Sequence, residues 1–157
     1  MTTSFESQLA ALDLVLPVPP KPVATYIPVV RAGDLLFLSG MIPLRDGTLV
    51  MAGKLGQDVS IEQGYEAAKI CVLNALAVIR EQVGTLDRVK QVVRMVGYVS
   101  STAEFVQQPA VINGASDLLV KIFGDAGRHA RVAIGTVALP LNAPVEIELI
   151  VQVNDPS

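Results

Sequence analysis

The chain has 157 residues, of which 51% are hydrophobic and 17% charged, and this length suits one domain with a sizeable core. The formal net charge of −3 and the lack of any lysine- or arginine-rich run exclude the basic surface that nucleic-acid-binding proteins need. The single cysteine excludes an internal disulfide, and no apolar run reaches the roughly 18 residues of a membrane span. The first 16 residues carry acidic but no basic side chains, unlike a secretory signal, so we expect a cytoplasmic protein.

The chain is predicted to begin with an extension at residues 1–22, followed by a single domain at 23–157. A short amphipathic helix is predicted from Ser4 to Leu16, because apolar residues recur there at helical spacing. The proline-rich run 17–22 must be an extended connector, since proline lacks the amide hydrogen that a helix requires.

The domain is predicted to open with a β-hairpin. Tyr26–Arg31 and Leu35–Ser39 have strand composition, and the turn sequence Ala32-Gly33-Asp34 separates them. A second turn is expected at Asp46-Gly47 and a loop at 52–58.

Two helices and three strands are predicted in the remainder of the domain. Ser60 and Gln63 form a capping box ahead of an apolar stripe that ends near Gly84. The other predicted elements are a valine-rich strand (88–100), a helix from about 105–109 to 123–124, and two strands (130–139 and 145–153). This order predicts an α+β fold in which two helices cover one face of a mixed sheet.

The last strand alternates with a period of two. Its odd positions from Val145 to Val153 are all apolar, whereas Glu146 and Glu148 lie on the other face. Two interpretations of that other face remain open: the glutamates solvate it, or a second subunit covers it with Arg131 and Glu146 at its edge. The aliphatic surplus of the whole chain favours an oligomer, because a monomer of this size has too little interior to bury it.

Other reactive residues carry weak signals. His129 is the only histidine, and Cys71 lies within the first long helix, where packed side chains are the ordinary explanation. No metal-ligand spacing, phosphate-binding glycine loop or catalytic triad is present in the sequence, so we expect neither a metal nor another cofactor.

From Tyr26 to Val153 the chain resembles the RidA (YjgF) family. The most specific match joins Arg128-His-Ala-Arg131 to Val145-Glu-Ile-Glu148, with the family's spacing of 15 residues (146 − 131) from Arg131 to Glu146. The other matching stretches are Gly33–Pro43, Gln63–Asn74 and Leu86–Val99. The resemblance implies a chorismate-mutase-like fold, assembled as a homotrimer with its sheets facing inward as a barrel and a cleft between each pair of subunits.

The resemblance also implies a reaction and a set of site residues. Family members hydrolyse reactive 2-imino or enamine acids, such as 2-aminoacrylate, to 2-oxo acids and ammonia. By the same resemblance Arg131 grips the substrate carboxylate, Glu146 handles water and protons, and Tyr26 orients the substrate or donates a proton. Ser39 and Asn113 are the remaining expected substrate-binding residues.

Ala133 departs from the family pattern, because members with deaminase activity usually have a cysteine there. Two other functions are therefore considered. One is a trimer that binds small carboxylates without turnover; the other, a ribonuclease or translation inhibitor, conflicts with the acidic composition. The partners we expect are further copies of the chain and a small 2-imino or 2-oxo acid, with neither nucleic acid nor membrane.

Overall fold

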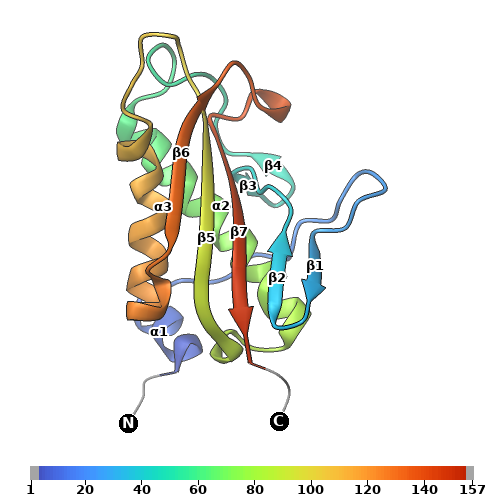
Figure 1. The fold of residues 1–157 in the computed structure, drawn as a ribbon. Helices are drawn as coiled ribbons and strands as arrows, with labels where there is room; N and C mark the ends of the chain where they lie inside the picture. The colour runs from blue at the N-terminus through green and yellow to red at the C-terminus, as the bar shows by residue number, and fades with distance from the viewer. Residues whose placement is uncertain (1–3, 155–157) are drawn as a thin grey trace.

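The computed structural model describes residues 4–154 and contains a five-stranded mixed sheet in the order β1-β2-β7-β5-β6 (Figure 1). Neighbouring strands run antiparallel except for β5 and β6, which are parallel. The parallel pair is joined by a crossover through helix α3, as parallel strands require. The strands of this sheet are β1 (Val29–Ala32), β2 (Leu35–Leu38), β5 (Val89–Ser100), β6 (Ala130–Thr136) and β7 (Val145–Val153).

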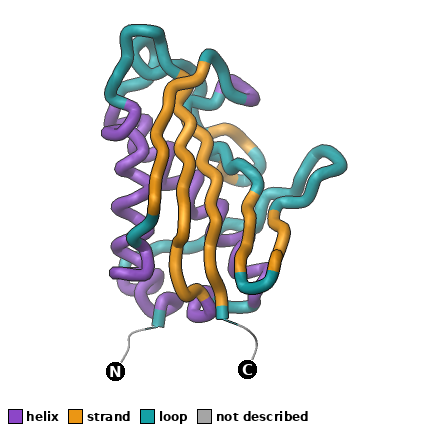
Figure 2. Tube along the Cα trace, viewed as in Figure 1, coloured by secondary structure: helices purple, strands orange, loops and turns teal. Residues whose placement is uncertain are grey.

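Helices α2 (Ile61–Val83) and α3 (Gln108–Phe123) cover one face of the sheet, as predicted (Figures 1 and 2). The odd positions of β7 face them and are at most 1% exposed. Two glycines allow α3 to approach its neighbours: a Cβ on Gly97 would lie 2.5 Å from Ile112, and one on Gly114 would lie 2.1 Å from the carbonyl oxygen of Tyr65. This close packing fixes the position of the polar side chains on α3.

Several predicted elements are confirmed by the structure. The capping box of Ser60 and Gln63 is formed, and α2 ends at Gly84 with φ of 88°. The hairpin of β1 and β2 is formed around the predicted turn, although β1 begins only at Val29 and leaves Tyr26 in the preceding bend. Short 3₁₀ turns at Leu86–Arg88, Gly124–Gly127 and Pro140–Asn142 connect the longer elements.

Three further features differ from the prediction. Helix α1 spans only Phe5–Ala11, because the chain turns at Asp13 (φ 53°) instead of continuing to Leu16. Strand β6 ends at Thr136, and Val137 beyond it is 87% exposed. The turn at Asp46-Gly47 joins a short hairpin that was not predicted, made of β3 (Leu44–Arg45) and β4 (Thr48–Leu49).

The N-terminal segment is attached to the core. The rings of Phe5 and Phe123 meet edge to face with their centroids 4.8 Å apart. Glu6 accepts a hydrogen bond from the backbone N–H of Leu86 (2.9 Å) and pairs with Arg80 (3.3 Å). After α1 the connector crosses the molecule toward the β1–β2 side, where it meets the segment that follows β2 (Figure 1).

The second face of the sheet is not covered by any element within residues 4–154. The even positions of β7 lie on this open face and are only partly buried, so Glu146 and Glu148 point away from the helices as the alternation predicts. Apolar side chains share the face: Val30 is 51% exposed, Phe37 41% and Ile134 42%. Among the described residues, no helix combines the length and apolar character that crossing a membrane requires.

Candidate functional site

Arg131 lies on β6 opposite Met95, and its side chain points to the helix-covered side of the sheet. Its Nη1 donates to the Asn113 side-chain oxygen at 2.8 Å and to the Ser116 hydroxyl at 3.1 Å. Both acceptors are neutral, and Arg131 forms no ion pair with a carboxylate of residues 4–154. Nη1 is therefore anchored, while Nε and Nη2 have no acceptor in the described part of the chain; these two donors form one bidentate edge that suits a carboxylate.

Ser116 connects Arg131 to His129. His129 Nδ1 lies 2.6 Å from the Gly127 carbonyl oxygen, which can only accept, so Nδ1 carries the proton. In the neutral ring Nε2 is then an acceptor, and it receives the Ser116 hydroxyl hydrogen at 3.0 Å. Burial lowers the pKa of His129, the Gly127 carbonyl acts in the opposite direction, and the nearby charge of Arg131 lowers it further. A neutral His129 thus leaves the Ser116 lone pairs free for Arg131.

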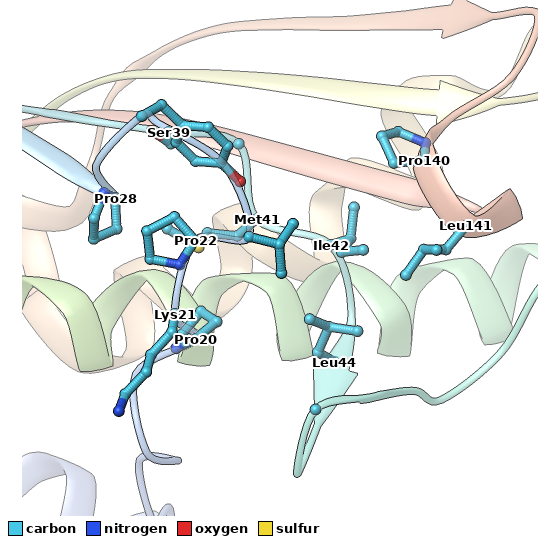
Figure 3. Close-up of a pocket in the computed structure, with 14 residues that line it drawn as sticks. Pro20, Lys21, Pro22, Pro28, Ser39, Met41, Ile42, Leu44, Pro140 and Leu141 are labelled. Atoms are coloured by element: carbon cyan, nitrogen blue, oxygen red, sulfur yellow. The ribbon is translucent and has the colours of Figure 1, made fainter.

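Tyr26 and Ser39 lie elsewhere, in the wall of a pocket of about 400 Å³ on the β1–β2 side (Figure 3). The Ser39 hydroxyl donates to the Ile27 carbonyl oxygen (2.7 Å), and its backbone N–H donates to the Pro28 carbonyl oxygen (2.9 Å). These bonds hold the bend that contains Tyr26, which is 53% exposed. Because the hydroxyl hydrogen of Ser39 is engaged, this side chain offers a ligand only an acceptor.

Glu146 lies against Gly40, which is one of the residues that line this pocket. A Cβ built on Gly40 would lie 2.0 Å from Glu146 Oε1, so the carboxylate occupies the space that any other residue would fill at position 40. Burial raises the pKa of Glu146, and the negative charge of Glu148 raises it further. Glu148 is tied to Tyr98, whose hydroxyl donates to it at 3.3 Å. A half-buried carboxyl with a raised pKa holds a proton more readily than an ordinary glutamate, which suits it to proton transfer.

The expected site residues therefore form two separate groups within the chain. Arg131 and Asn113 form the first group; Tyr26, Ser39 and Glu146 form the second, and strand β5 lies between β6 and β7. The interpretation that Arg131 borders the same outer face as Glu146 is wrong for this chain, because Arg131 aligns with Met95, whose side chain is buried under the helices. The pocket lined by Tyr26 and Ser39 does not include Arg131.

Two further residues belong to the candidate site and were not predicted. Ser116 follows Asn113 by three positions on α3, and this spacing places both on one face of the helix, a signal that could have identified it. Gly40 was part of a matching motif, but no local sequence pattern indicates its contact with Glu146.

Cys71 is fully buried, and burial raises the pKa of its thiol well above the usual value. Within residues 4–154, no three histidine, cysteine or acidic side chains gather in a way that could hold a metal ion.

Comparison with known proteins identifies relatives over nearly the whole chain. The family model described as "YjgF/chorismate_mutase-like, putative endoribonuclease" matches residues 6–153. The protein TCP17 of Trypanosoma cruzi is 38% identical over 150 residues, which cover 95% of this chain and 94% of that protein. The crystal structure of the Agrobacterium tumefaciens protein Atu1372, of unknown function, is 40% identical with a TM-score of 0.89, covering 96% of this chain and 92% of that one. A "putative endoribonuclease" of Shewanella oneidensis is 35% identical with a TM-score of 0.93, covering 96% of this chain and all of that one (100%).

Proposed function

Because the chain belongs to the YjgF/RidA family, we propose that it hydrolyses reactive 2-imino and enamine acids, such as 2-aminoacrylate, to 2-oxo acids and ammonia. The observation that carries the proposal is the guanidinium of Arg131, anchored through Nη1 to two neutral acceptors. A buried or half-buried guanidinium needs an anionic partner, and no carboxylate of residues 4–154 serves as one. A substrate carboxylate on the Nε–Nη2 edge supplies it through two charge-assisted hydrogen bonds.

The second part of the proposal is a homotrimer in which each cleft combines the two groups of residues. Arg131 and Asn113 of one subunit would face Tyr26, Ser39 and Glu146 of the next. The open sheet face supports this assembly, since it carries exposed apolar side chains around the two glutamates. Cyclic closure uses one surface of each subunit against a different surface of the next, which matches a site whose two groups lie apart within one chain.

The proposed chemistry requires little from the protein, because a protonated imine carbon is already electrophilic. Arg131 fixes the carboxylate, and Ser39, which can only accept, receives an N–H of the iminium group. Glu146 takes a proton from water as the oxygen attacks C2, giving a carbinolamine. Glu146 then returns that proton to the nitrogen, and the C–N bond breaks with its electron pair leaving on ammonia. As the 2-oxo group forms, the carboxylate of Glu146 takes the hydroxyl proton and passes it to the departing ammonia, which leaves as ammonium. The raised pKa of Glu146 suits these transfers.

The test is to generate 2-aminoacrylate in place with a serine dehydratase and to measure the release of pyruvate and ammonia. Wild-type protein should accelerate release over buffer. Arg131→Ala should remove most of the acceleration, and Glu146→Gln should lower kcat more than it raises KM, since water still binds but no base accepts its proton. No acceleration by an assembled wild-type protein would refute the deaminase proposal.

A second candidate function is a trimer that binds small carboxylates without turnover. It is favoured by Ala133, two positions after Arg131 on β6, because family members with deaminase activity usually have a cysteine at this position. Calorimetric titration with pyruvate separates the candidates. Binding that Arg131→Ala abolishes, together with no turnover of 2-aminoacrylate, would identify the binding protein.

Size-exclusion chromatography with light scattering tests the trimer. Ile134→Glu on the open face should dissociate the trimer, because the substitution places an unpaired charge in the buried interface.

A further inference from the structure

The pocket beside Ser39 has an unusual wall at Leu141. This leucine has φ of 57° and ψ of 18°, which lie in the left-handed region that residues other than glycine, asparagine and aspartate rarely adopt. Hydrogen bonds across the turn hold it there: Asn142 N–H to the Leu139 carbonyl oxygen (3.1 Å) and Ala143 N–H to that of Pro140 (3.0 Å). The side chain is 70% exposed, so burial in the core of this chain does not compensate the strain.

The strained leucine faces a pocket with two proline-containing walls (Figure 3). Pro140 and Leu141 form one side, and the connector residues Pro20 and Pro22 form another, with Met41 and Ile42 between them. Prolines have no N–H and keep their shape, so these walls are rigid and present few donors. The two sides come from segments 120 residues apart in the chain (140 − 20), which indicates that the tertiary fold assembles the pocket rather than a local loop.

Few polar side chains line this pocket. Of its lining side chains only those of Lys21, Tyr26 and Ser39 carry polar atoms, and Ser39 already uses its hydrogen. Glu146 lies against Gly40, the residue that follows Ser39. The volume of about 400 Å³ falls within the roughly 300–1,000 Å³ of small-molecule sites, whose linings are mostly apolar with a few polar groups that set orientation. A ligand that fits has a polar head at Ser39 and an apolar body toward Leu141.

We propose that this pocket is the side-chain subsite of the cleft, and that it selects 2-imino acids whose side chain is bulky and apolar, branched aliphatic or aromatic, over 2-aminoacrylate. This inference rests on the proposed function of the same site. The C=N group lies against Ser39 and Glu146, and the side chain extends between Leu141 and the Pro20–Pro22 segment. The connector thereby becomes part of the specificity-determining surface.

The test compares imines of alanine, leucine and phenylalanine, each made in place by an L-amino acid oxidase with catalase present. Acceleration of 2-oxo acid release over buffer gives kcat/KM for each. A single methylene that fills an apolar pocket changes the ratio of kcat/KM between two substrates by about 10- to 200-fold. The kcat/KM of wild-type protein should therefore be at least about tenfold higher for the leucine imine than for the alanine imine. Leu141→Gly, which relieves the strained backbone, should bring the ratio to within about threefold without loss of thermal stability, because glycine is favoured in the left-handed region. Leu141→Met keeps an apolar side chain and should retain the preference, and Val15→Ala, at an exposed position outside the pocket, serves as the matched control.

Each outcome addresses either the subsite or the chemistry. Turnover of all three imines with equal kcat/KM, or an unchanged ratio in Leu141→Gly, overturns the subsite and leaves the deaminase proposal intact. Loss of trimer in Leu141→Gly with an unchanged ratio would assign this leucine to subunit packing instead. If no imine is turned over, calorimetry with pyruvate and 4-methyl-2-oxopentanoate decides: tighter binding of the larger acid that Leu141→Gly removes supports the subsite, and equal or absent binding overturns it.

Discussion

Gly40→Ala isolates the role of Glu146 with a single methyl group. An ideal Cβ at position 40 would lie 2.0 Å from Glu146 Oε1, 2.9 Å from Cδ and 3.1 Å from Cγ. Ordinary contact begins at 3.4 Å, so Oε1 must move by at least 1.4 Å (3.4 − 2.0). Gly40 is outside the left-handed region, so alanine fits its backbone, and only the far end of a flexible side chain has to shift.

This displacement should reduce catalysis while leaving stability nearly unchanged. A misplacement of about 1 Å can reduce rate by about 10²-fold, and we expect a loss of that order in kcat with 2-imino acids. KM should change by less than about threefold, because in the proposed cleft the carboxylate is held by Arg131 and not by Glu146. Unfolding free energy should change by no more than about 1 kcal/mol, since glycine-to-alanine replacement at a compatible position restricts the unfolded chain.

The measurement is steady-state release of 2-oxo acid, with thermal unfolding of the same samples. Repeating Gly40→Ala in a Glu146→Ala background provides the decisive control, because no carboxylate remains to be displaced and the second substitution should then cost almost nothing. A full hundredfold loss in that background would refute the reasoning, as would unchanged kcat in Gly40→Ala alone.

Two further predictions concern charge and positioning. Glu146→Gln should raise the midpoint of thermal unfolding at pH 7.5. Burial and the charge of Glu148 raise the pKa of Glu146 in the folded protein, so ionisation of Glu146 destabilises the native state as pH rises. The gain in unfolding midpoint should vanish as pH falls to about 4, where Glu146 holds its proton in the unfolded chain as well. A gain of the same size at pH 4 and pH 7.5 would contradict this assignment. Ser116→Ala removes one of the two acceptors of Arg131 and should raise KM for 2-imino acids by about tenfold with kcat nearly unchanged, because carboxylate binding is shared by ground and transition states. Ser116→Thr keeps the hydroxyl and should restore KM; a fall in kcat without a change in KM would assign Ser116 a different role.

Periodic and local signals determined much of the fold. The helix from Ile61 to Val83 was identified by its capping box and apolar stripe, both of which depend on neighbours within a few residues. Strand β7 was identified to the residue by its alternation, because one buried face imposes a period of two on the whole strand. The same alternation is enough to place Glu146 and Glu148 on the face opposite the buried valines.

The face of the sheet on which Arg131 lies, and the distant residues that meet one another, depended on the tertiary structure. The parallel register of β5 and β6 turned Arg131 toward α3 and away from the face of Glu146, and no local pattern specifies that register. Gly40 meets Glu146 across 106 positions (146 − 40), and the proline connector meets Leu141 across a similar separation. The sequence alone determined the elements, because hydrogen bonding and burial along one helix or strand are short-range. Only the packed fold decided which polar groups meet, because long-range contacts depend on the simultaneous packing of all the elements.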